Sequence, residues 1–235
     1  MTEGGNPMIG EEIVHVNGIP KKAVVFLHGY QDCAEHIERR TEKLQTLADT
    51  AFHIPQAPFL NEVDALKRQW YSIHQFDPDD KRRITASWNE FIELYNRMTV
   101  GLETANHYIL EYIDNLLNEY GLAYEDLFLC GFSQGAMCAV YSGLMCPHKI
   151  AGVISFSGIL AAQGYIKQHY RSRPDFLLIH GSADNAVRFE ALQFTKEQLE
   201  KMGCHAQAFT VENAGHKITQ EAVDAAYSFI KTKSK

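Results

Sequence analysis

The chain has 235 residues, 46% of them hydrophobic, which is enough for one well-packed core. No linker, charge block or repeat divides it, so we expect a single domain over 1–235, with an N-terminal segment and first strand at 1–20. The formal net charge of −7 comes without a basic stripe, which argues against nucleic acid as a partner.

Targeting signals and cysteine spacing indicate the compartment. The first ten residues are polar and Gly-rich, unlike a signal peptide, and no run of about 18 apolar residues predicts a membrane span. The cysteines are odd in number and lack CxxC spacing, which favours reduced thiols in a cytoplasmic protein. Because no paired-ligand spacing occurs either, we expect no metal site.

The N-terminal part begins with predicted strands. Weak alternation predicts a strand over 12–16, and a continuous apolar run over 22–27 predicts a strand buried on both faces. A helix is predicted over 35–50, followed by a short strand over 51–54 that ends at Pro55.

The middle of the chain is irregular and then helical. Residues 59–83 mix aromatic and charged side chains without periodicity, so we predict a long surface excursion of the functional kind. Residues 84–120 carry apolar side chains at three- and four-residue steps, which predicts helix, and Gly101 could divide it in two. We interpret the aromatic residues of this stripe as core packing.

The C-terminal part alternates strictly between strand and helix. Strands are predicted over 126–130, 150–156, 175–180 and 205–211, and helices over 133–146, 189–202 and 218–231. This alternation indicates an α/β fold with a mostly parallel central sheet and helices on both faces. Ligands then bind at the edge where the strands end.

One motif carries the strongest chemical signal. Gly131-Phe132-Ser133-Gln134-Gly135 follows an apolar strand and opens a helix of small residues. In the α/β-hydrolase fold this pattern forms a sharp turn that exposes a nucleophilic serine. We therefore predict Ser133 as the nucleophile of acyl transfer, against the alternative of an ordinary Gly-rich turn.

Serine needs a base to remove its proton, and the base needs an orienting carboxylate. Among the downstream histidines, His216 lies between the last strand and the last helix, at the same edge as Ser133. Asp184 follows the strand at 175–180 and is the preferred acid, and Glu212 is the second choice. The alternative role for Asp184 is that of a helix or turn cap. Asp175 falls at the opposite end of that strand.

The negative charge that develops on a carbonyl oxygen needs backbone N–H donors. One donor is expected from Gln134, the residue after the nucleophile, and we assign the other to Tyr30, in the loop after the strand at 22–27. His28 is expected to organise that loop through hydrogen bonds.

Five segments together are similar to the phospholipase/carboxylesterase family, which includes acyl-protein thioesterases, lysophospholipases and small bacterial carboxylesterases. They are Phe26-Leu27-His28-Gly29, Gln69-Trp70-Tyr71-Ser72, Gly131-Phe132-Ser133-Gln134-Gly135-Ala136, His180-Gly181-Ser182-Ala183-Asp184 and Ala214-Gly215-His216. The resemblance covers roughly 21–230. It implies a triad of Ser133, Asp184 and His216 and an oxyanion hole at Tyr30 and Gln134.

The resemblance also implies that Trp70 lies beside the acyl pocket, and we expect the neighbouring Tyr71 to contact substrate with it. The chain departs from the family at Tyr30 and Gln31, where leucine and glycine are frequent; the larger side chains would reshape the acyl entrance. Arg68-Gln69-Trp70-Tyr71-Ser72 looks closest to the bacterial carboxylesterase branch.

The expected function is hydrolysis of a carboxylic ester or thioester through an acyl-enzyme. The substrate would be a small, lipid-like molecule, no cofactor is required, and the excursion over 59–83 would lie near the active site. The alternatives are a non-catalytic binding module of the same fold, and a peptidase or acyltransferase with the same triad. A homodimer is an open option.

Overall fold

The computed structural model describes residues 12–85 and 87–233. Its main sheet has seven strands within these residues, in the order β1-β3-β2-β6-β7-β8-β9. Six run parallel, and β1 pairs antiparallel with β3 at one edge. The strands are β1 (Glu12–Asn17), β2 (Lys22–Leu27), β3 (Thr50–Pro55), β6 (Leu127–Phe132), β7 (Gly152–Phe156), β8 (Phe176–Gly181) and β9 (Ala206–Val211). The predicted α/β fold with a mostly parallel sheet is confirmed.

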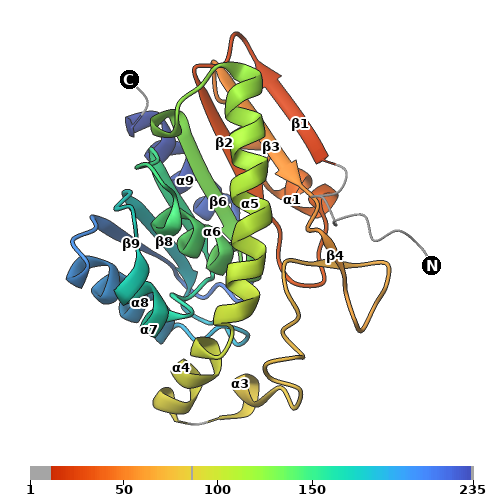
Figure 1. Cartoon of the computed structure of the whole chain (residues 1–235), viewed down its shortest axis with the longest axis vertical. Helices are drawn as coiled ribbons and strands as arrows, with labels where there is room; N and C mark the ends of the chain where they lie inside the picture. Colours follow the sequence, from red (N-terminus) through yellow and green to blue (C-terminus); the bar gives the residue numbers. More distant parts are fainter. Residues whose placement is uncertain (1–11, 86, 234–235) are drawn as a thin grey trace.

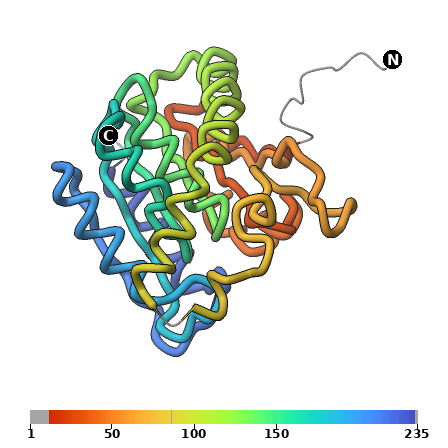
Figure 2. The backbone as a smooth tube through the Cα atoms, turned by 60° about the horizontal axis from the view of Figure 1, so that its bottom comes forward, coloured from red at the N-terminus to blue at the C-terminus, as the bar shows by residue number. Residues whose placement is uncertain are grey.

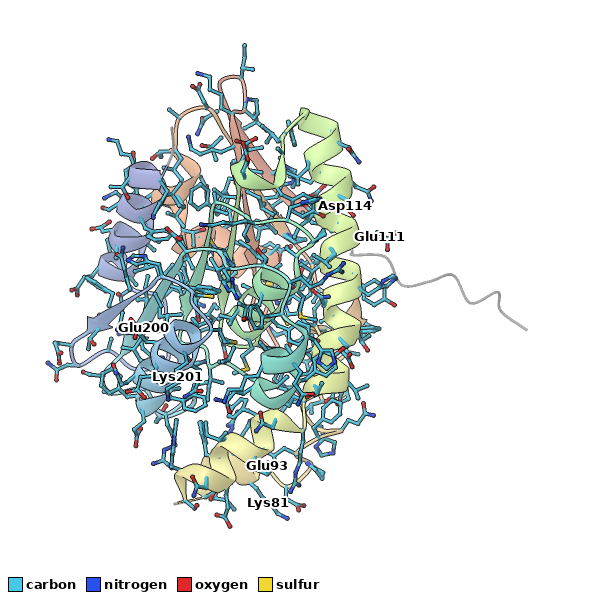
Figure 3. The ribbon with its side chains drawn as sticks, turned by 60° about the vertical axis from the view of Figure 1, so that its left-hand side comes forward. Lys81, Glu93, Glu111, Asp114, Glu200 and Lys201 are labelled. Carbon is cyan, nitrogen blue, oxygen red and sulfur yellow. The ribbon has the colours of Figure 1, made fainter. Side chains whose placement is uncertain are left out.

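Helices cover both faces of the sheet, as Figure 1 shows. One face packs on α1 (Ala34–Arg40), α2 (Glu42–Gln45) and α9 (Gln220–Lys233). The other packs on α4 (Trp88–Asn96), α5 (Thr99–Tyr120), α6 (Gln134–Met145), α7 (Gln163–His169) and α8 (Glu190–Lys201). Figure 3 shows charged residues on the outer surfaces of these helices, such as Glu111 on α5 and Glu200 on α8.

Strand residues divide between two cores in strict alternation. In β2, Ala23, Val25 and Leu27 face one core, whereas Val24 and Phe26 face the other. Both sets are fully buried, because helices lie on both sides of the strand. This explains why the strand has a continuous apolar sequence.

The excursion between β3 and α4 is more ordered than the sequence predicts. It contains a two-stranded ribbon, β4 (Phe59–Leu60) with β5 (Arg68–Gln69), and the short helix α3 (Lys81–Ile84). Figures 1 and 2 show α3 and α4 beyond the end of the sheet at which the parallel strands finish.

Two predicted boundaries are wrong. The helix expected over 35–50 is two short helices that end at Gln45, and Thr50 already belongs to β3. The helices are divided at the fully buried Thr41, whose Oγ1 donates to the Ile37 carbonyl (2.8 Å). The break expected at Gly101 lies instead between α4 and α5, at Arg97 and Met98. The helix α7 and the 3₁₀ turn η1 (Tyr124–Asp126) were also not predicted.

The described residues contain no helix that is long and apolar enough to cross a bilayer. Residues 1–11, which include the whole ten-residue segment tested for a signal peptide, lie outside the described part.

Candidate active site

Ser133 lies on the turn between β6 and α6. Its backbone has φ 54° and ψ −115°, an unfavourable conformation for a residue with a side chain. The Ser133 N–H donates to the Phe156 carbonyl (2.9 Å), which ties the turn to β7. A sharp strained turn of this kind exposes the hydroxyl at the N-terminus of the helix.

Two glycines are required by close backbone approach around this turn. A Cβ on Gly131 would lie 2.2 Å from the Gly135 carbonyl oxygen, and one on Gly135 would lie 2.2 Å from the Leu27 carbonyl oxygen. Real Cβ contacts are not that short, so both positions need glycine. The contact at Gly135 also shows that the end of β2 abuts the start of α6.

Three loops bring the predicted triad together at the strand ends. His216 Nε2 lies 2.9 Å from Ser133 Oγ, and His216 Nδ1 lies 2.8 Å from Asp184 Oδ2. The Ala183 N–H donates to the Ala214 carbonyl (2.9 Å). This bond joins the loop after β8 that carries Asp184 (the acid loop) to the loop after β9 that carries His216 (the histidine loop). The arrangement places one imidazole between a hydroxyl and a carboxylate.

Glu212, the second choice for the acid, has a different partner. Its Oε2 accepts a hydrogen bond from Ser182 Oγ (3.1 Å), and the Asn213 N–H donates to the same hydroxyl (2.8 Å). This network holds the turn after β9. In the structure, therefore, Asp184 rather than Glu212 contacts His216.

The Asp184 carboxylate is wholly buried and well supplied with donors. Its Oδ1 accepts from the N–H groups of Ala186 (2.9 Å) and Val187 (3.0 Å). Burial alone would raise the pKa of Asp184, but the contacts with His180, His216 and Val187 outweigh burial and hold the pKa well below its usual range. The carboxylate therefore stays ionised beside His216.

The loop after β2 is fixed by the buried His28. Its Nδ1 lies 2.8 Å from the Gly29 carbonyl oxygen, and its Nε2 accepts from the Ala57 N–H (3.0 Å). The Gln31 N–H donates to the Arg68 carbonyl (3.0 Å), so the ribbon β4–β5 holds the loop from its other side. These bonds hold the loop that carries Tyr30, and the end of β2 before that loop abuts the start of α6 at Gly135.

Gln134 has two separate roles in this geometry. As the first residue of α6 it has an N–H without an intrahelical partner. Its side chain is fully buried; Oε1 accepts from the Trp70 N–H (3.0 Å) and Nε2 donates to the Tyr71 carbonyl (2.8 Å). Sequence reasoning missed this second role, because no local pattern links positions 64 residues apart.

Trp70 and Tyr71, the two residues predicted to contact substrate, differ in their surroundings. Trp70 has no exposed surface, and its Nε1 donates to the His28 carbonyl (2.9 Å), so its side chain braces the loop instead of lining an open pocket. Tyr71 is 3% exposed and borders a hollow of about 350 Å³. The apolar residues that line the hollow with it are Phe59, Leu60, Phe76, Val100 and Gly101, and the polar ones are Gln69, Ser72, Gln75 and Thr104.

One cluster could in principle bind a metal ion. Ligand atoms of Asp32, Cys33 and His36 lie within 4.8 Å of one another. The Asp32 carboxylate is, however, already 2.6 Å from His36 Nδ1 and 3.9 Å from Arg40. These ion pairs account for the cluster without an ion.

Comparisons with known proteins identify the family of the chain. The profile of the phospholipase/carboxylesterase family matches residues 9–234. Acyl-protein thioesterase 1 of Neurospora crassa is 26% identical over 88% of this chain and 84% of its own length. The protein of that name from Saccharomyces cerevisiae is 24% identical over 90% of this chain and 92% of its own.

Solved structures show the same likeness. The crystal structure of esterase PE8 is 28% identical and covers 97% of this chain and 99% of its own, with a TM-score of 0.84. SOBER1 of Arabidopsis thaliana, 24% identical with a TM-score of 0.75, covers 91% of this chain and 99% of its own and shares the fold. The chain belongs to the phospholipase/carboxylesterase family of α/β-hydrolases and is a carboxylic ester hydrolase.

Proposed function

We propose that the chain hydrolyses carboxylic esters or thioesters through an acyl-enzyme on Ser133. The observation that carries the proposal is the continuous contact from Ser133 Oγ through His216 to Asp184, at 2.9 and 2.8 Å. Ser133 Oγ attacks the carbonyl carbon while its proton passes to His216 Nε2, and Asp184 stabilises the imidazolium that forms. The proton then passes to the departing alcohol or thiol, which leaves the acyl group on Ser133.

Water completes the cycle by the same route. His216 Nε2 takes a proton from the water as its oxygen attacks the acyl carbonyl, and it returns the proton to Ser133 Oγ as the carboxylic acid departs. In both halves the carbonyl oxygen becomes negative. We assign its two donors to the backbone N–H groups of Tyr30 and Gln134, whose loops meet where Gly135 packs on the end of β2.

We propose that the substrate is a small ester or thioester with an apolar group. The support is the largely apolar hollow beside Tyr71, which lies on the segment that Gln134 ties to the start of α6. Trp70 acts indirectly, because its indole holds the loop that carries Tyr30. A series of acyl esters and thioesters of increasing chain length, assayed for kcat/KM, measures the preference.

Replacement of the nucleophile tests the triad. We expect Ser133→Ala to lower kcat for a short activated ester by roughly 10⁴-fold or more and to abolish fluorophosphonate labelling. Ser228→Ala, on the exposed surface of α9, is the matched control and is expected to behave as wild type. Near-full activity of Ser133→Ala would rule out the proposal. A screen of alcohol and amine acceptors separates hydrolysis from acyl transfer.

A further inference from the structure

A second histidine reaches the same carboxylate as His216. His180, the last residue but one of β8, is 2% exposed, and its Nε2 lies 3.3 Å from Asp184 Oδ2. The same nitrogen lies 2.9 Å from the Val187 carbonyl oxygen. Asp184 Oδ2 is therefore within 3.3 Å of a nitrogen of each of two imidazoles.

The proton position on His180 follows from its partners. A carbonyl oxygen is only an acceptor, so the contact with Val187 requires the hydrogen of His180 to be on Nε2. That N–H donates to the Val187 carbonyl, and the nitrogen that carries it is 3.3 Å from Asp184 Oδ2. Its partial positive charge, inside a buried site, favours an ionised oxygen at that position.

The contacts of His180 also close the acid loop on itself. Val187 accepts from His180 through its carbonyl and donates to Asp184 Oδ1 through its N–H (3.0 Å). Val187 therefore links the end of β8 to the Asp184 carboxylate. Because both carboxylate oxygens of Asp184 have partners, the group has little freedom to rotate away from His216.

We propose that His180 is a positioning residue, which holds the Asp184 carboxylate in the orientation that aligns His216 with Ser133. The inference rests on the proposed function, since it needs the triad to be the catalytic one. The competing interpretation is that His180 only fills space, because its ring also packs edge-on against Phe189 at 6.1 Å between centroids.

Two substitutions distinguish the interpretations. His180→Phe keeps a flat ring against Phe189 and removes the N–H, whereas His180→Gln places an amide N–H near the position of Nε2. We expect His180→Phe to lower kcat roughly 10- to 100-fold with KM within about 2-fold, since a small misplacement of a catalytic group has effects of this size. We expect His180→Gln to recover kcat to within about 3-fold of wild type.

His205→Phe is the matched control, because His205 is exposed and precedes β9 at the opposite end from the site. Melting curves for all variants verify folding. If His180→Phe does not fold, His180→Asn replaces it, because its shorter amide does not extend to the position of Nε2. Equal kcat in the Asn and Gln variants would then overturn the proposal.

The proposal is also overturned if folded His180→Phe keeps the wild-type kcat, or if His180→Phe and His180→Gln lose the same amount. Ser133→Ala is assayed in parallel. Activity in Ser133→Ala would refute the proposed function itself. An inactive Ser133→Ala beside a fully active His180→Phe refutes only the role of His180.

Discussion

At the scale of single residues, Asp184 connects the candidate active site to stability. Its pKa is lowered in the fold despite burial, because N–H groups of His180, His216 and Val187 surround the carboxylate. A carboxyl group whose pKa is lower in the folded than in the unfolded state stabilises the fold above its unfolded pKa, about 3.9. That contribution is lost as the pH falls through the folded pKa.

Asp184→Asn, which cannot ionise, should therefore destabilise the protein most at neutral pH. We expect the difference in unfolding free energy between wild type and variant to be constant above about pH 5 and to shrink below it. Urea unfolding at a series of pH values measures this difference. Asp79→Asn, at an exposed carboxylate, is the control. A difference independent of pH down to about 3 would contradict the account.

The residues that sequence could identify are those with a local pattern. Ser133 lies between two glycines in a recognisable motif, and His216 and Asp184 follow predicted strands. Residue type and position therefore predicted a role for each of the three. His180 carried a weaker signal, as a histidine directly before Gly181 and four residues before Asp184. The side-chain contacts of Gln134 and the burial of Trp70 depend on loops far apart in sequence, which no spacing rule describes.

At the scale of elements, Gly101 shows how tertiary contact overrides propensity. Glycine disfavours a helix interior, which made it the natural place for a break. It lies instead inside α5, where an added Cβ would be 2.7 Å from Cδ2 of Tyr71 and 2.9 Å from Cε2 of Phe76. The glycine lets the excursion pack against the helix, and that contact is invisible to local periodicity.

Gly101→Ala sets two effects against each other. Helix propensity would gain up to about 1 kcal/mol, but overpacking against two aromatic rings costs about 1–3 kcal/mol. We expect a net loss in unfolding free energy of about 1 kcal/mol, measured by urea unfolding. Gly164→Ala in α7, where nothing lies within 4 Å of the added carbon, is expected to be neutral or stabilising. Equal effects at the two sites would contradict the packing argument.

At the scale of the whole molecule, the sequence predicted the alternation of strands and helices and hence the edge at which the site forms. It did not predict the strand order, which places β1 at one edge, separated from β6 by β3 and β2. Strand order depends on long-range pairing that one sequence does not reveal. As a consequence, Ser133 follows the central strand β6, whereas a separate polar network lies at the edge of the sheet.

That edge network joins β1 to the sheet and to α5. His53 on β3 is 2% exposed, and its Nδ1 lies 2.9 Å from both Glu12 Oε2 and the Tyr112 hydroxyl. Tyr112 also donates to Glu12, and His53 Nε2 lies 3.2 Å from the Tyr120 hydroxyl. A strand at the edge of a sheet has one neighbour only, so contacts of this kind supplement its ladder.

Tyr112→Phe removes one hydroxyl from the edge network and leaves the ring in place. We expect the unfolding free energy to fall by about 0.5–1.5 kcal/mol and hydrogen exchange over 12–17 to become faster, while kcat stays at the wild-type value. Tyr108→Phe, on the same helix but packed on Phe59, is the control. A loss of kcat in folded Tyr112→Phe would show that the edge of the sheet is coupled to Ser133, against the separation that the strand order implies.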